Sequence, residues 1–156
     1  YGFVGNDPVN WVDPWGLYIM FSQDVLPYIP GIPRFSDKDS FEKLINSIEN
    51  GETHIIIVAH GDDAGAMINA GGKKLCGDGK KKIAGESLYG PLIANKDRFS
   101  ENVEIEFIVC NLYKDEQGEQ IKEILENAFP EGKIIGYNYE IFQGRGVAAL
   151  IRELFR

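Results

Sequence analysis

Two apolar stretches decide the fold of this chain: HIIIVAHGDD at residues 54–63 and VEIEFIVCN at residues 103–111. Residues 53–59 form a continuous run rich in β-branched side chains, which is typical of a buried parallel strand. The second stretch alternates, which predicts a strand with one apolar face, made of Val103, Ile105, Phe107 and Val109. Both stretches are therefore predicted to be strands of one sheet.

Helical and turn-forming patterns surround these two strands. Apolar residues repeat at helical spacing over 41–48, where Ser36 or Asp37 can cap the helix and Gly51 is expected to end it. The remaining predicted elements are a short strand at 17–21, a hairpin or mobile loop in the glycine-rich stretch 61–85, a weak helix at 87–96, a helix at 119–129 that Pro130 stops, a strand at 133–137 and a closing helix at 147–155.

Strands that alternate with helices predict the α/β class, with right-handed crossovers and a mostly parallel sheet flanked by helices. In such sheets, ligands bind at the carboxyl ends of the strands. Each of the two deciding strands carries one reactive side chain there, His60 after the first and Cys110 after the second. A nucleophile and a base on rigid strand ends can approach within hydrogen-bond reach. His54, at the other end of its strand, is interpreted as structural.

This arrangement resembles the caspase-like cysteine peptidases, which include caspases, gingipains, separase, CHAT domains and the self-cutting domains of large bacterial toxins. Their signature is an apolar strand, His-Gly, and a second apolar strand that ends in the nucleophilic Cys. Here His60-Gly61 and Cys110 fit it, 50 positions apart. Val109 stands where a small residue is common, and the QACxG string is absent. The resemblance, over residues 52–137, implies a three-layer sandwich, a His60–Cys110 dyad and an oxyanion hole formed by the N–H groups of Gly61 and Cys110.

Other residues near the strand ends are weaker candidates. Asp62 and Asp63 either orient His60, favour a basic substrate residue, or are solvated loop charges. Gln143 and Arg145 follow the strand predicted at 133–137 and are candidates for a specificity pocket on position alone. The competing interpretation of Cys110 and His60 themselves is that they are core residues, because free cysteine is among the residues most often buried.

The N-terminal segment YGFVGNDPVNWVDPWGL has turn formers and aromatic residues but no helical or alternating period. It resembles the closing motif of the Rhs/YD-repeat core, Tyr-x4-Asn-x-Pro-x4-Asp-Pro-x-Gly-Leu. The matching positions are Tyr1, Asn6, Pro8, Asp13, Pro14, Gly16 and Leu17, with Asp7 where Asn is common. The resemblance places a domain boundary after Leu17, with the end of the core at 1–17 and a C-terminal toxin domain at 18–156.

The Rhs resemblance also implies a biological setting. The shell protein cuts itself after the motif, which predicts processing between Leu17 and Tyr18, with Asp13 as a candidate participant. We expect secretion as part of a larger Rhs protein, by a type VI or related system, and action in the target-cell cytoplasm. The expected partners are the Rhs core shell, a cognate immunity protein and a protein substrate.

Composition limits the other functions of the chain. The 156 residues suit one domain, and a formal net charge of −8 argues against a nucleic-acid partner, although Lys73, Lys74 and Lys80–Lys82 cluster locally. No apolar run is long enough to span a membrane, and no cysteine–histidine spacing suggests a metal or another cofactor. The alternatives are a different Rhs tip toxin, either a nuclease or an ADP-ribosyltransferase, and a non-catalytic binding domain.

Overall fold

The computed structural model describes residues 17–25, 30–61, 68–70, 73–76 and 86–141. Within these residues the strands are β1 (Leu17–Ser22), β2 (Arg34–Phe35), β3 (Glu52–Val58), β4 (His60–Gly61), β5 (Ile68–Ala70), β6 (Lys73–Cys76), β7 (Phe99–Ile108) and β8 (Lys133–Ile135). The helices are α1 (Lys38–Asn46), α2 (Glu86–Ala94) and α3 (Glu116–Ala128), with a 3-10 turn, η1 (Lys96–Arg98), after α2.

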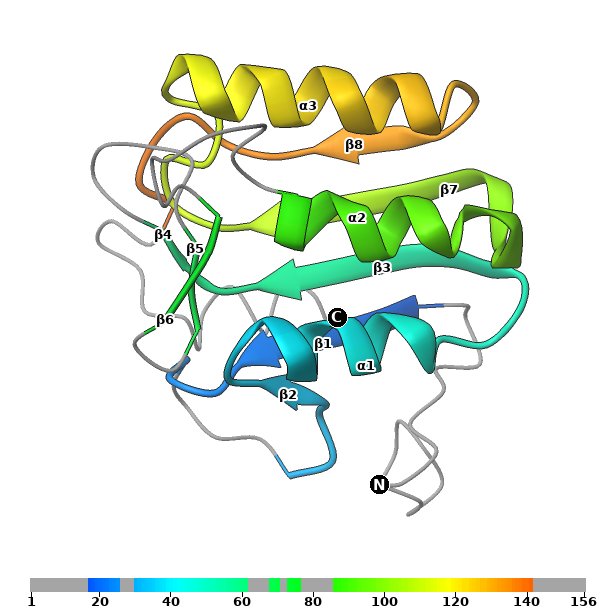
Figure 1. Ribbon diagram of the computed structural model, residues 1–156, viewed down its shortest axis with the longest axis horizontal. Coiled ribbons are helices and arrows are strands. Elements are labelled where there is room, and N and C mark those ends of the chain that lie inside the picture. Colours follow the sequence, from blue (N-terminus) through cyan, green and yellow to red (C-terminus); the bar gives the residue numbers. More distant parts are fainter. Residues whose placement is uncertain (1–16, 26–29, 62–67, 71–72, 77–85, 142–156) are drawn as a thin grey trace.

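The main sheet has five strands in the order β2-β1-β3-β7-β8 (Figure 1). Every neighbouring pair in it is parallel. The predicted α/β class, with a parallel sheet flanked by helices, is therefore confirmed, and the arrangement is consistent with a caspase-like sandwich. The two strands that the sequence singled out, β3 and β7, are neighbours in the middle of the sheet.

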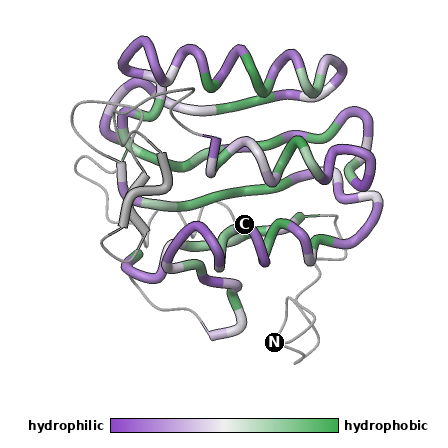
Figure 2. Tube along the Cα trace, in the orientation of Figure 1, coloured by the Kyte–Doolittle hydropathy of each residue, from purple (hydrophilic) through white to green (hydrophobic). Residues whose placement is uncertain are grey.

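The described helices pack on one face of the sheet, where they bury a continuous core. That core joins residues of all three helices to β3 and β7: Phe41, Ile45, Leu88, Leu92, Ile121 and Leu125 meet Ile55, Ile57, Ile105 and Phe107. Figure 2 shows apolar residues concentrated along the central strands and interspersed with hydrophilic ones along α1 and α3. The predicted alternation is also confirmed, because Val103, Ile105 and Phe107 of β7, and Val109 just after it, are fully buried in this core.

A second cluster covers the opposite face of the sheet. Its buried members are Ile19, Phe21, Val25, Ile32, Ile56, Val58, Ile108 and Ile141. Apolar side chains thus line both faces of β1 and β3, as expected for strands inside a parallel sheet. The helix predicted at 147–155 lies outside the described residues.

Local capping explains why α1 begins where predicted and ends earlier. Asp37 is the N-cap, since the Ser40 N–H donates to Asp37 Oδ1 (2.9 Å) and the Asp37 N–H donates to Ser40 Oγ (3.0 Å). The predicted end at Gly51 was wrong, because Ser47 closes the last turn and its hydroxyl donates to the Leu44 carbonyl (2.7 Å). Gly51 instead has a φ of 86° and turns the chain into β3.

Other element boundaries also moved by short distances. β7 begins at Phe99, before the predicted start, and α3 begins at Glu116 because Asp115 accepts a hydrogen bond from the Gly118 N–H (2.8 Å). β2 was not predicted. The glycine-rich stretch contains the expected hairpin, β5–β6, to which β4 adds a third antiparallel strand. In the described part of the chain, no helix is long and apolar enough to cross a membrane.

A charged cluster lies on the face of the sheet opposite the helices. His54 Nε2 is 3.0 Å from Glu104 Oε2 and 3.9 Å from Glu106 Oε1, and the Tyr137 hydroxyl donates to Glu106 Oε2 (2.8 Å). The carboxylates of Glu106 and Glu104 raise the pKa of His54 above its ordinary value, although burial of the ring opposes this shift. His54, together with the hydrogen bond from Tyr137, lowers the pKa of Glu106.

The raised pKa predicts how His54 contributes to stability. A raised folded-state pKa adds stability that is complete below the unfolded value and is lost as pH rises through the folded value. We expect His54→Gln to lower the free energy of unfolding by about 0.5–1 kcal/mol at pH 6, because the pair is partly exposed, and by less at pH 8. Urea unfolding at the two pH values measures this difference. A difference that grows with pH would contradict the assignment.

Candidate active site

The carboxyl ends of β3 and β7 lie side by side and carry the two predicted reactive residues. The parallel register pairs Val58 with Ile108 at the end of the ladder, and the Ala59 N–H donates to the Ile108 carbonyl just beyond it (3.2 Å). His60 and Cys110 each lie two residues beyond this last pair, and His60 there begins β4. The structure therefore brings the two to the same end of adjacent strands.

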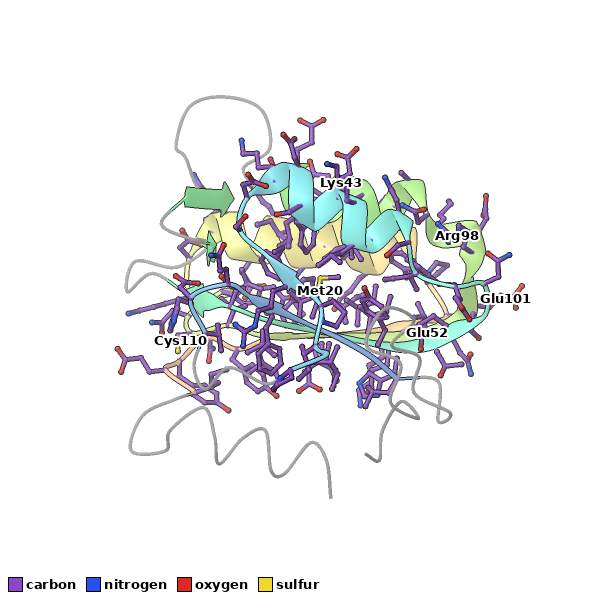
Figure 3. The ribbon with its side chains drawn as sticks, turned by 90° about the horizontal axis from the view of Figure 1, so that it is seen from below. Met20, Lys43, Glu52, Arg98, Glu101 and Cys110 are labelled. Carbon is purple, nitrogen blue, oxygen red and sulfur yellow. The ribbon has the colours of Figure 1, made fainter. Side chains whose placement is uncertain are left out.

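The side chain of Cys110 lies on one face of the main sheet, at its carboxyl end. Cys110 packs against the cluster that contains Val58 and Ile108, on the face opposite the helices. His60 begins β4, the strand of the small antiparallel sheet that starts just beyond the end of β3. Cys110 is a free, half-buried cysteine, and Figure 3 shows it at the end of the sheet opposite Glu52, Arg98 and Glu101.

Gly61 lies directly against the backbone of Cys110. A Cβ atom on Gly61 would overlap the carbonyl oxygen of Cys110 and would also lie only 2.8 Å from its carbonyl carbon and 3.0 Å from its amide nitrogen. Only glycine allows this approach. The two residues that the resemblance assigns to an oxyanion hole are thus adjacent in space, although far apart in sequence.

This approach makes Gly61→Ala a severe change. The methyl group would meet backbone atoms, which cannot rotate away, so we expect a loss of about 1–3 kcal/mol of stability together with displacement of Cys110. Gly90→Ala, in α2, is the matched control, because the nearest atom to its added Cβ is Glu86 Cγ at 3.9 Å. Alanine favours a helix by about 1 kcal/mol over glycine. Denaturant unfolding of both variants tests this; equal stability of Gly61→Ala and the parent chain would contradict it.

The ring of His60 has a backbone acceptor near it. Its Nε2 lies 3.3 Å from the carbonyl oxygen of Asp24, in the loop after β1. A neutral histidine that donates from Nε2 has Nδ1 free to accept a proton. In the described part of the chain, no hydrogen bond joins His60 to Cys110. Catalytic contacts are often long without substrate and tighten only in the complex.

The chain turns sharply directly after Cys110. Asn111 is buried and has a φ of 57°, the left-handed conformation that asparagine tolerates better than most residues. Its N–H donates to the carbonyl of Tyr139 (3.0 Å), and the N–H of Tyr113 donates to the carbonyl of Tyr137 (3.0 Å). These bonds hold the segment after β8 alongside the turn that carries Cys110.

Two aromatic rings in that segment lie near the turn. The rings of Tyr137 and Tyr139 meet edge to face, with their centroids 5.5 Å apart. Tyr137 packs against the same cluster as Cys110, whereas the side chain of Tyr139 is 57% exposed. The exposed ring of Tyr139, whose backbone is bonded to the residue after Cys110, offers apolar surface to a bound chain.

Several predicted residues lie outside the described part of the chain. They are Asp13, Asp62, Asp63, Gln143 and Arg145. The expected processing bond, Leu17–Tyr18, joins the first two residues of β1, where Leu17 pairs with His54 and Tyr18 with Ile55. A cut there would leave Tyr18 as the first residue of the strand.

Sequence reasoning missed Asp24, Asn111 and the two tyrosines. Asp24 follows β1 in a segment broken by prolines, and no periodic pattern there indicates a contact with His60.

Within the described residues, no group of three or more His, Cys, Asp or Glu side chains could hold a metal ion.

The geometry defines an α/β protein whose parallel sheet carries a histidine and a cysteine at the carboxyl end of neighbouring central strands. Comparisons with family models, curated proteins and solved structures give no match for this chain. What the protein does must therefore be inferred from its own residues.

Proposed function

We propose that this chain carries the C-terminal toxin domain of an Rhs protein and that the domain is a cysteine peptidase with a His60–Cys110 dyad. The observation that carries the peptidase proposal is the β3–β7 register, which brings the carboxyl ends of the two strands that precede His60 and Cys110 side by side. The contact between Gly61 and the Cys110 backbone supports it. The Rhs part of the proposal rests on the motif at residues 1–17.

The proposed reaction is hydrolysis of a peptide bond through a thioester. His60 Nδ1 takes the thiol proton, and Cys110 Sγ attacks the scissile carbonyl carbon. The N–H groups of Gly61 and Cys110 stabilise the oxyanion, and one such donor is typically worth about 10²–10³ in kcat. The C–N bond then breaks, the amine leaves with the proton from His60, and water hydrolyses the thioester by the same steps.

The carbonyl of Asp24 would serve as the third group of this site. A base in a nucleophile–base pair is usually oriented by another acceptor. By accepting a hydrogen bond from His60 Nε2 (3.3 Å), the Asp24 carbonyl keeps the proton on that nitrogen and leaves His60 Nδ1 as the base. A rotation of the Cys110 side chain toward His60 is the movement that the mechanism requires.

The test is a survey of new protein termini in a sensitive cell. Residues 18–156 are expressed in parallel with Cys110→Ala, at matched levels. The proposal expects recurrent new termini with the parent domain and none with the variant. Toxicity that persists in Cys110→Ala would exclude the peptidase, and degraded nucleic acid or ADP-ribosylated protein would identify one of the alternative toxins.

The Rhs setting adds further proposals. The domain would be exported within its core shell, by a type VI or related system, released by a cut between Leu17 and Tyr18, and act on a protein in the target-cell cytoplasm. A small immunity protein from the neighbouring gene would neutralise it by covering the strand ends. N-terminal sequencing of the released fragment and co-expression of the neighbouring product test these points. A start far from Tyr18, or toxicity unchanged by the neighbour, would refute them.

A further inference from the structure

The loop that contacts His60 is itself held by one arginine. Arg34 Nη1 donates to the carbonyls of Ser22 (3.3 Å), Gln23 (3.1 Å) and Val25 (3.0 Å). The carbonyl of Asp24, between them in sequence, lies near His60 Nε2 instead. Four successive carbonyls are thus divided between the guanidinium and the imidazole.

The sheet fixes the position of Arg34. It belongs to β2, where it pairs with Phe21 of β1, and its guanidinium carbon lies 5.7 Å from the centroid of the buried Phe21 ring. The Gln23 N–H donates to the carbonyl of Phe35 (2.8 Å), which ties the loop to the same strand. The charge therefore comes from a rigid part of the fold.

The loop itself needs such a support. Gln23 and Asp24 are exposed, so burial of their side chains does not fix the backbone. The Ser22 hydroxyl bonds the Asp24 carboxylate and restrains the side chain, while the guanidinium restrains the carbonyls on either side of Asp24. Hydrogen bonds from a charged donor are stronger than neutral ones.

We propose that Arg34 is a positioning residue, which holds residues 22–25 so that the Asp24 carbonyl keeps His60 with its proton on Nε2. This inference deepens the proposed peptidase function and rests on it for its catalytic consequence. In this proposal Arg34 acts through the loop and the ring of His60, and not on the substrate. A misplacement of about 1 Å in such a site can reduce the rate about 10²-fold, and we expect that loss in kcat, with KM little changed, for Arg34→Gln.

The decisive readout is the protonation of the His60 ring, measured by ¹H–¹⁵N spectra of the imidazole nitrogens. The parent domain is expected to be protonated at Nε2 when neutral, and Arg34→Gln to show a mixture of both tautomers. Arg34→Lys keeps a charged donor and should restore most of the parent spectrum and of kcat. Should Arg34→Gln fail to fold, Arg34→Lys remains the test, because its spectrum and its kcat should fall slightly short of those of the parent domain.

Arg98 provides a matched control at the opposite end of the sheet. Its Nη1 donates to the Asn46 carbonyl (2.5 Å) and its Nη2 to the Ile48 carbonyl, so it also holds loop carbonyls. Arg98→Gln should lower stability without changing the His60 spectrum or kcat. An unchanged His60 spectrum in folded Arg34→Gln, or an equal change in Arg98→Gln, would overturn the inference. Absence of cleavage by the parent domain would instead refute the proposed function alone.

Discussion

Cys110→Ala is expected to abolish peptide cleavage by this domain while leaving it folded. The sulfur is the only atom of the protein that forms a covalent bond to the substrate in the proposed mechanism, and loss of a nucleophile typically costs about 10⁴–10⁶ in kcat. Cys110 is half-buried at a strand end, so its truncation should cost about 1 kcal/mol of stability at most. Cleavage of a peptide taken from the survey of termini, together with thermal unfolding, measures both effects.

Cys76→Ala is the control for this experiment. Cys76 ends β6 of the small antiparallel sheet and has no part in the proposed dyad. Its removal should leave kcat nearly unchanged. Cleavage that survives in Cys110→Ala, or that disappears in Cys76→Ala, would show that the nucleophile has been assigned to the wrong residue.

His60→Ala is expected to have a similarly large effect, and the two losses should not add. The base acts only through the nucleophile, so removing either one leaves the other without a function. We expect a loss of about 10³-fold or more in kcat for His60→Ala and no further loss in the double variant. His54→Gln, which changes the other histidine, should retain activity. Losses that multiply in the double variant would mean that the residues act independently.

The strand pattern made most of the fold predictable. Burial against one core produces the apolar runs that became β3 and β7. It also produces the helical spacing of apolar residues that became α1 and α3. The misplaced boundaries depend on single hydrogen bonds, such as the Ser47 hydroxyl that closes α1 and the Asp115 carboxylate that begins α3. Such bonds leave no periodic signal in a sequence.

The candidate site was predictable only in part, for a related reason. His60 and Cys110 follow apolar strands, and parallel strands that are adjacent bring their ends together. The contacts of Arg34 and Asp24 instead pass through an aperiodic loop, and the β2–β1 pairing that fixes them covers only two residues on each strand. The turn at Asn111 likewise depends on the chain after β8.

The most direct test of the central claim is the reactivity of the Cys110 thiol at neutral pH. The domain is treated with iodoacetamide at pH 7, and mass spectrometry follows alkylation of Cys110 and Cys76 in the parent chain and in His60→Ala. A dyad predicts that Cys110 reacts at least about tenfold faster than Cys76. It also predicts that His60→Ala removes this difference in rate. A Cys110 that reacts no faster than Cys76, with or without His60, would be a core cysteine and would contradict the account.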